Sequence, residues 1–415
     1  MVPSSSLGPS PFLFWATLPL QPPSTPDSLP DNEGADMRIS LISAALVAAL
    51  VGYGSTIALV LSAAQALGAS PAQTASWVFA VCIAKAVGSA VLSTWARVPV
   101  VLAWSTPGAA LIAASEGLSM AEGVAAFVAT GLLILATGLI RPLGRLIAAI
   151  PSEIAAAMLA GVLLPFCLKV PHQAANLPDL VLPIIGIFVL VRLYNPSFAV
   201  LAALAGGLAL TFGSGTPLPQ GPFAAPAPVL IAPHFTLAGL IGLGLPLYLV
   251  TMASQNLPGF AVLRAAGYEP PVARALGVTG ILSALSGLFG AHTINMAAIT
   301  AAICLGDDVH PDRSQRWKVG LAYAAFWAGL GLFGPVILAG LAALPPGMIA
   351  TVAGLALIAP LMGALGSAFA VPQTRFPAAV TLIVAASGVS AFGIGGAFWG
   401  LVAGLAAYIL DRLRR

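Results

Sequence analysis

Long apolar runs constrain this chain more than any other feature of its sequence. From Arg38 to the carboxyl terminus, runs of about 20 apolar residues recur, which is the length that spans a bilayer. Only 7% of the residues are charged, whereas a soluble domain carries about 25%. The runs are continuous rather than alternating, which argues against a membrane β-barrel. We therefore expect an all-α polytopic membrane protein.

The first residues of the chain, 1–37, differ from all that follows. They are rich in Pro and Ser and contain no Lys or Arg, whereas a signal peptide needs a basic start. This composition predicts a disordered tail. Met37, followed by Arg38, is an alternative start of translation, which leaves open whether residues 1–36 are translated.

The distribution of positive charge fixes the number of spans. We expect fourteen spans, at about 39–66, 72–93, 98–114, 119–140, 146–168, 178–194, 197–212, 236–255, 273–289, 291–305, 315–340, 346–368, 376–391 and 395–411. With both termini in the cytoplasm, the inner segments hold Arg38, Arg97, Arg141, Arg145, Arg192, Arg264, Arg274, Arg313, Arg316, Lys318, Arg375, Arg412, Arg414 and Arg415. Lys169 is the exception outside, and Lys85 lies within a span. This topology follows the positive-inside rule, which a different span count would break.

The spans divide into two sets of seven. We expect one repeat over 38–212 and a second over 236–415, joined by an extracytoplasmic linker at 213–235. An odd number of spans per half inserts the halves in opposite orientations, as in many secondary transporters. Short matches support this division: LVGYGST (50–56) resembles LVTMASQN (249–256), and LAWSTPGAALIAA (102–114) resembles LFGAHTINMAAITAA (288–302).

The third and tenth spans are both interrupted by polar and helix-breaking residues. Thr106 and Pro107 predict a helix start, with Thr106 as the N-cap after an extended stretch. Thr293 or Asn295 would cap the matching helix in the tenth span. A helix that starts in mid-membrane presents unpaired amides and a positive dipole end. Two such starts facing each other would bind a small anion, such as a carboxylate. The alternative is a proline-kinked helix with ordinary packing.

Three more polar features fall within spans. Gln255 and Asn256 end the eighth span, where they contact a substrate, hold the broken helices or cap a helix end before Pro258. His292 titrates near neutrality and is a candidate for proton coupling, with a structural role as the alternative. Lys85 would attract an anion, pair with another group or extend its charge towards the membrane surface.

The sequence lacks the motifs that mark ATP-driven pumps, hydrolases and metal sites. The chain has no GxxxxGK[ST], HExxH or GxSxG, so we expect neither an ATP-driven pump nor an enzyme. Cys82, Cys167 and Cys304 each lie alone, so we expect no metal site and no cofactor, with the proton gradient as the driving force. No basic domain indicates nucleic-acid binding.

Several motifs in the same order resemble one known family. They are AWSTPGAALI, PLYLVTMASQNLPG, AAITAAIC, HPD followed by QRW, and GIGGAFWGL. Together they resemble the benzoate/proton symporter (BenE) family over about 38–412. That family is similar in fold to uracil and xanthine permeases and to sulfate-type anion exchangers. The resemblance implies a core domain (about 38–140 plus 236–340) and a gate domain (about 141–212 plus 341–412). It also implies a bacterial inner-membrane location and a possible homodimer through the gate domain.

The resemblance implies proton-coupled import of benzoate or a related aromatic carboxylate by alternating access. The residues Ser254, Gln255 and Asn256 favour a substrate that accepts hydrogen bonds, whereas nucleobase permeases use acidic groups there. We expect substrate binding by Tyr53, Trp104, Ser105, Thr106, Pro107, Gly108, Gln255, Asn256, Phe289, His292, Thr293 and Asn295. His292 is the expected proton carrier, and Lys85 is the expected electrostatic contributor. The alternatives are a nucleobase or inorganic-anion carrier, or, in another class, a channel or non-transporting scaffold.

Overall fold

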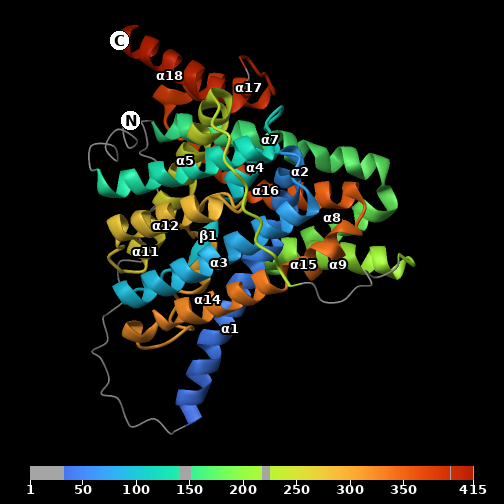
Figure 1. Cartoon of the computed structure of the whole chain (residues 1–415), viewed down its shortest axis with the longest axis vertical. Coiled ribbons are helices and arrows are strands. Elements are labelled where there is room, and N and C mark those ends of the chain that lie inside the picture. Colours follow the sequence, from blue (N-terminus) through green and yellow to red (C-terminus); the bar gives the residue numbers. More distant parts are fainter. Residues whose placement is uncertain (1–31, 141–150, 217–224, 393, 415) are drawn as a thin grey trace, which may run out of the picture.

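The computed structural model describes residues 32–140, 151–216, 225–392 and 394–414, which form a helical bundle (Figure 1). In chain order the helices are α1 (Asn32–Gly54), α2 (Ile57–Ala66), α3 (Pro71–Ala96), α4 (Thr106–Ala113), α5 (Met120–Leu139), α7 (Ser152–Asn176), α8 (Pro178–Tyr194), α9 (Ala199–Gly213), α10 (Leu245–Thr251), α11 (Leu257–Ala265), α12 (Val272–Gly287), α13 (Ile299–Ile303), α14 (Lys318–Leu332), α15 (Gly334–Ala342), α16 (Pro346–Ala368), α17 (Arg375–Ala386) and α18 (Gly396–Arg414). Two short strands, β1 (Leu102–Trp104) and β2 (Ile294–Met296), interrupt the helical pattern. The predicted tail lies outside the described residues up to position 31, and α1 begins at Asn32 rather than after residue 37.

The prediction of a polytopic α-helical membrane protein is confirmed. Within the described ranges, eight helical segments are long and apolar enough to cross a membrane. A ninth is added if Arg313–Leu332 and Gly334–Ala342, which meet at a bend of 55°, form one span. The remaining expected spans coincide with helices that are shorter, such as α8, α12 and α17, or with a strand followed by a short helix.

Local sequence signals explain where several helices begin. α3 follows Ser70, whose hydroxyl accepts a hydrogen bond from the Gln73 amide while the Gln73 side chain accepts one from the Ser70 amide. Ser119 and Glu122 form the same reciprocal arrangement before α5. Such capping boxes satisfy amides that have no partner within the helix.

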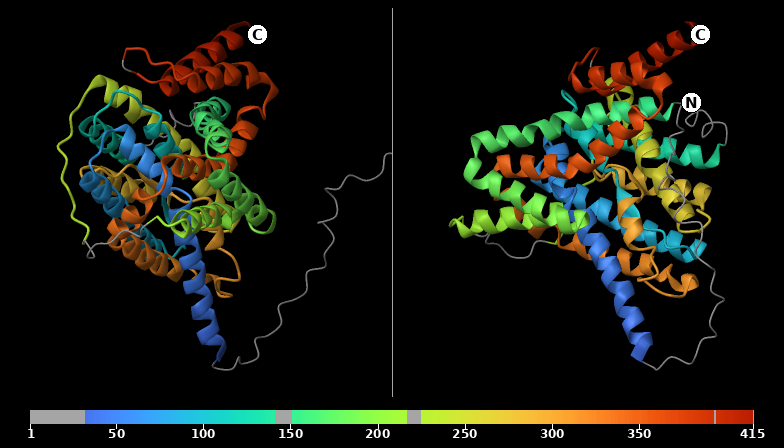
Figure 2. Two further views of the ribbon diagram at one scale, coloured as in Figure 1. Left: turned by 90° about the vertical axis from the view of Figure 1, so that its right-hand side faces the viewer. Right: turned by 180° about the vertical axis from the view of Figure 1, so that it is seen from behind.

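The helices pack into two groups that lie on opposite sides of the molecule in Figure 1 and in the view from behind in Figure 2. In the first helix group, α3 packs against α12 and α14, and α5 packs against α12. In the second helix group, α7 packs against α16, and α8 packs against α9 and α16. Short helices α2 and α4 contact each other, and they reach the second group at α16 and α7 respectively.

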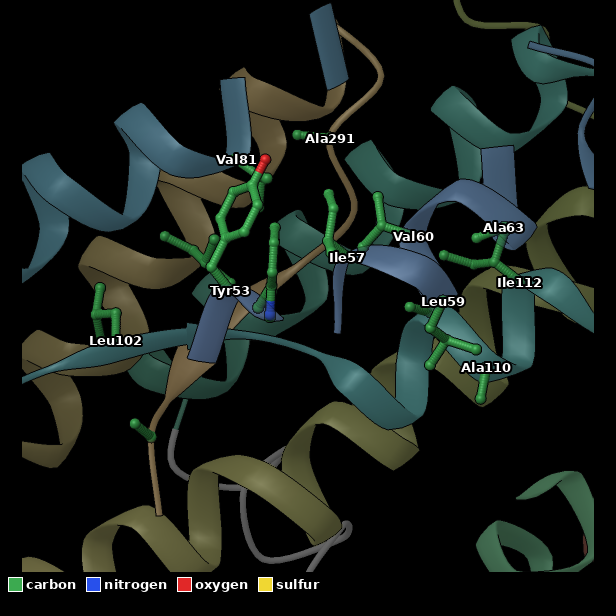
Figure 3. Close-up of a cluster of buried hydrophobic side chains, with 14 of the residues drawn as sticks. Tyr53, Ile57, Leu59, Val60, Ala63, Val81, Leu102, Ala110, Ile112 and Ala291 are labelled. Atoms are coloured by element: carbon green, nitrogen blue, oxygen red, sulfur yellow. The ribbon is translucent and has the colours of Figure 1, made fainter. Parts of the chain in front are cut away.

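The apolar interior is continuous around the strand pair. Figure 3 shows Tyr53, Ile57, Val81, Leu102 and Ala291 within one buried cluster, contributed by the first three helices, β1 and the segment before β2. All five side chains are buried. Since apolar burial is the main force that holds such elements together, this cluster fixes the strands in the middle of the fold.

The eighth span does not end near Gln255, as the sequence suggested. Its helix runs from Ala238 to Ala265 and passes through Pro258. A proline inside a helix removes one amide and crowds the preceding turn. The chain accommodates it by widening into a π-helical turn over Met252–Asn256, a distortion that often marks functional sites. Gln255 and Asn256 therefore lie inside a span rather than at its end.

Candidate functional site

The two interrupted spans meet as a pair of antiparallel strands. Leu102 pairs with Met296, and Trp104 pairs with Ile294. The predicted extended stretch before Thr106 is therefore confirmed. The predicted caps of the second helix are wrong: α13 begins only at Ile299, and Thr293 and Asn295 lie in or beside β2. The backbone of residues 293–296 is engaged in pairing with the first strand, so it is not free to start a helix there.

Two serines from neighbouring helices hold the strands at equivalent points. The Ser89 hydroxyl of α3 accepts a hydrogen bond from the Leu102 amide at 3.0 Å. The Ser283 hydroxyl of α12 accepts one from the Ile294 amide, also at 3.0 Å. Both serines are fully buried. One outward-facing amide of each short strand thus has a side-chain partner, as a buried backbone group requires.

Ser105, rather than the predicted Thr106, caps helix α4. Its hydroxyl accepts a hydrogen bond from the Gly108 amide at 3.1 Å, and its own amide donates to the Thr293 carbonyl at 3.0 Å. Thr106 is the first helical residue, and its hydroxyl instead lies 2.9 Å from that of Thr56. The Ser105 and Gly108 amides therefore already have partners, which weakens the expectation that a substrate anion binds to them.

A chain of hydroxyl groups links the two interruptions. The Thr251 hydroxyl of α10 donates to the Ser105 hydroxyl at 3.1 Å and lies 3.0 Å from the Thr293 hydroxyl. All three side chains are fully buried. Because each group is satisfied by another, this network fixes the relative position of both interruptions and of the eighth span.

The two neighbouring amides of the eighth span have different roles. Asn256 is fully buried, and its side-chain oxygen accepts a hydrogen bond from the Met296 amide at 2.9 Å. Gln255 is half-buried and faces a cavity, and its oxygen accepts a weak hydrogen bond from Asn295 at 3.4 Å. Asn256 thus supports β2, whereas Gln255 is the one available to a ligand.

A cavity of about 640 Å³ lies between the two helix groups. On the side of the first helix group, the cavity wall contains the start of α4 and the residues just before α13, including Thr106 and Ala298. On the side of the second helix group, the wall contains residues of α7 and α16, such as Met158 and Pro360. Most of the lining is apolar. A pocket of this size, with a few converging polar groups, is typical of a small-molecule site.

The cavity brings together only part of the predicted set. Of the predicted binding residues, the wall contains Trp104, Thr106, Pro107 and Gln255, and it also contains the expected electrostatic residue Lys85. The wall does not include Tyr53, Ser105, Gly108, Asn256, Phe289, His292, Thr293 or Asn295. Most of these support the wall from behind through the hydrogen bonds and ring contacts of the strand pair.

Lys85 is the most unusual residue of the site. Its side chain is 0% exposed, and its ammonium has no hydrogen-bond partner among the described residues. The nitrogen lies over the ring of Trp327, 2.8 Å from the centroid, and over that of Trp104 at 4.5 Å. Tyr53 packs against both tryptophans. Ring faces attract a cation, but they leave its hydrogen-bonding capacity unused.

His292 is not part of the cavity wall, and its ring packs against Trp104, which is. Its Nδ1 atom accepts a hydrogen bond from the Trp77 indole nitrogen at 2.9 Å. Its ring stacks on Trp104 with centroids 6.4 Å apart. An indole nitrogen only donates, so this bond requires an unprotonated Nδ1. The geometry therefore favours the structural role that the sequence left as an alternative.

The sequence did not single out several residues that build the site. Trp327 and Tyr323 come from α14, and the Tyr323 hydroxyl donates to the Leu102 carbonyl at 2.9 Å. Ser89, Thr251 and Ser283 are small polar residues within apolar spans. A buried polar residue needs a partner, and this signal alone could have marked them, but not which backbone group each would meet.

Comparison with known proteins identifies close sequence relatives. The model of the family described as benzoate membrane transport protein, BenE, matches residues 35–410. The chain is 39% identical to the inner membrane protein YdcO of Escherichia coli over 372 residues, which covers 89% of this chain and 95% of that protein. It is 32% identical to the benzoate membrane transport protein of Acinetobacter baylyi over 378 residues, which covers 90% and 96% of the two chains.

Solved structures share the fold at lower identity. The transmembrane domain of the cyanobacterial bicarbonate transporter BicA matches with a TM-score of 0.54 and 16% identity, over 92% of this chain and 97% of that domain. The murine anion transporter Slc26a9 in the inward-facing state matches with a TM-score of 0.59 and 13% identity, over 95% and 73% of the two chains. By its sequence and fold, the chain is a membrane transporter, not an enzyme, and belongs to the BenE benzoate membrane transport family.

Proposed function

We propose that this protein is a secondary transporter of the bacterial inner membrane that imports benzoate or a related aromatic carboxylate together with protons. The name of the Acinetobacter baylyi relative, a benzoate membrane transport protein, supports the substrate, and the name of YdcO, an inner membrane protein, supports the membrane. The chemistry of the cavity supports a small organic anion independently of these names.

The observation that carries the proposal is a single buried lysine in the wall of an apolar cavity. Lys85 has no counter-ion or hydrogen-bond partner among the described residues. A carboxylate would supply both, since charge-assisted hydrogen bonds are the strong ones in a dry environment. The apolar wall and the Trp104 ring would bind an aromatic ring. One end of the site thus suits an anion, and the rest suits a hydrocarbon.

Polar groups near the start of α4 complete the binding mode. The Thr106 hydroxyl and the Gln255 amide both belong to the cavity wall, and both are able to donate to a carboxylate oxygen. Because Lys85 is covered by its neighbours, a carboxylate reaches it only after those side chains move aside. Binding would therefore reorganise the aromatic cluster rather than leave it unchanged.

We propose the same division into domains that the family resemblance implies. A core of about 38–140 plus 236–340 would carry the strand pair and Lys85, and a gate of about 141–212 plus 341–412 would carry the opposite wall. Ser89 and Ser283 lie in the second and ninth expected spans, and each accepts a hydrogen bond from the first residue of a strand. These matching positions support fourteen crossings in two inverted repeats. Movement of the core against the gate would expose the site to each side in turn. A homodimer through the gate stays a prediction.

The substrate class is tested by binding to the purified protein. We expect benzoate to raise the apparent thermal stability in detergent, because a ligand that binds only the folded state stabilises it. Uracil and sulfate at the same concentration should have no effect. Stabilisation by uracil or sulfate but not benzoate would assign the cavity to a nucleobase or an inorganic anion. Conductance without saturation would indicate a channel, and no response to any of these ligands would indicate a scaffold.

A further inference from the structure

Lys85 is surrounded by groups that cannot neutralise it. It interacts electrostatically with Cys82 of α3 and with His292 of the segment before β2. Tyr53 of α1 and Tyr323 of α14 pack against Trp327, whose ring lies under the ammonium. None of these is a carboxylate, and the described spans place no Asp or Glu beside the ammonium. An isolated ammonium that is fully removed from water is strongly disfavoured, and a buried amine then gives up its proton.

A carboxylate reverses this balance when it binds. An opposite charge within about 4–6 Å favours the charged form of an amine. The two tryptophan faces already over the nitrogen, Trp104 and Trp327, add a modest preference for the cation. The charge of Lys85 is thus tied to whether a carboxylate occupies the site.

We infer that Lys85, rather than His292, is the proton-coupling residue. This inference rests on the proposed function, because it requires a carboxylate substrate. On the outer side, the neutral amine takes up one proton and the carboxylate binds to the resulting ammonium. On the inner side the carboxylate leaves and the ammonium releases its proton to the cytoplasm. One proton and one carboxylate then enter together, with no net charge moved.

The location of His292 supports the assignment to Lys85. The histidine lies outside the cavity wall, and protonation of its Nδ1 would break the hydrogen bond from Trp77. Lys85 lies in the cavity wall, and it is one helical turn from Ser89, which holds β1. A change of charge at Lys85 therefore acts next to the strand that the substrate approaches.

The direct test is proton uptake on benzoate binding at alkaline pH, measured with a pH indicator in weakly buffered solution. Wild-type protein should take up about one proton for each benzoate bound. The His292→Asn variant, whose side-chain oxygen still accepts from Trp77, should take up the same number. Benzoate binding with no proton uptake by the wild type would overturn the inference while leaving the proposed function intact. Absence of benzoate binding by the wild type would instead refute the proposed function.

A charge-retaining variant gives the second readout. Lys85→Arg holds a permanent cation, because a guanidinium does not deprotonate in proteins. We expect its benzoate transport to respond to membrane potential and not to a pH gradient, whereas wild-type transport responds to the pH gradient and not to the potential. Lys85→Arg that transports with wild-type coupling would overturn the inference. If this variant does not fold, the proton count on wild type and His292→Asn decides: loss of proton uptake in His292→Asn alone would return the role to the histidine.

Discussion

At the scale of the residue, the site depends on polar side chains whose partners lie far away in the chain. Lys85 stood out in the sequence because a charge is rare in an apolar span, and Trp104 because it precedes the Ser-Thr-Pro-Gly interruption. Trp327 did not, although its ring lies over the Lys85 nitrogen. A tryptophan in an apolar run is ordinary, and only tertiary packing brings these two residues together.

The adjacent amides Asn256 and Gln255 should respond differently to alanine. Asn256→Ala leaves the buried Met296 amide without its acceptor, at a cost of about 1–3 kcal/mol in folding stability. Gln255→Ala should leave folding stability nearly unchanged. It should weaken benzoate binding about fivefold, because that factor in the dissociation constant corresponds to the loss of one ordinary hydrogen bond. The measurements are survival of monodisperse protein after heating and a benzoate titration. Equal effects of both variants on stability would contradict the assigned roles.

At the scale of the element, the sequence located both interrupted spans but not their pairing. A β-branched stretch followed by Ser-Thr-Pro-Gly predicted an extended entry and a helix, and both are present. The shift of the cap from Thr106 to Ser105 and the late start of α13 depend on the strand partner, which local propensity does not contain. The π-helical turn at Met252–Asn256 likewise reflects how Pro258 is accommodated within a packed bundle.

The two serines that hold the strands should prove equally important. Ser89→Ala and Ser283→Ala each leave a buried strand amide without an acceptor. We expect each to lower stability by about 1–3 kcal/mol. The matched control is Ser62→Ala in α2, whose hydroxyl only donates to the Ala58 carbonyl of its own helix and should change little. The same heating assay compares all three, and a control as damaging as the strand variants would argue against the role of the strands.

Close packing of α5 against α12 gives another element-scale prediction. A methyl group added at Gly280 would collide with the backbone of Leu135, whereas one at Gly277 on the same helix meets nothing within 4 Å. Gly280→Ala should therefore destabilise by about 1–3 kcal/mol through overpacking. Gly277→Ala should be neutral, or stabilise by up to about 1 kcal/mol through helix propensity. Unfolding midpoints in detergent check the pair, and tolerance of alanine at Gly280 would contradict the packing described for this interface.

At the scale of the whole molecule, composition and charge predicted a polytopic membrane protein. The division into two helix groups with a cavity between them did not follow from composition or charge, because it depends on which helices from distant parts of the chain pack together. Only the family resemblance implied a division into two domains. The cavity wall includes the exposed residues Ser152 and Ser367, near Arg145 and Arg375 in the chain. A second, smaller cavity of about 250 Å³ contains Ser115, Glu116 and Lys169.

Accessibility of introduced cysteines tests this arrangement in the membrane. In a variant without Cys82, Cys167 and Cys304, we expect a membrane-impermeant maleimide to label Ser367→Cys from the cytoplasmic side, and benzoate to slow the reaction. Ser115→Cys, in the smaller cavity, should react from the opposite side. Inside-out and right-side-out vesicles separate the two. Labelling of both positions from the same side would contradict the proposed topology.

The most direct test of the account is uptake of labelled benzoate into proteoliposomes with an alkaline interior. Because benzoic acid crosses bilayers unaided, protein-free liposomes and Lys85→Gln proteoliposomes serve as controls, at an external pH where benzoate is almost fully ionised. The account predicts saturable uptake by wild-type protein that far exceeds both controls and collapses when a protonophore removes the gradient. Wild-type uptake equal to that of protein-free liposomes, or indifferent to the gradient, would contradict it.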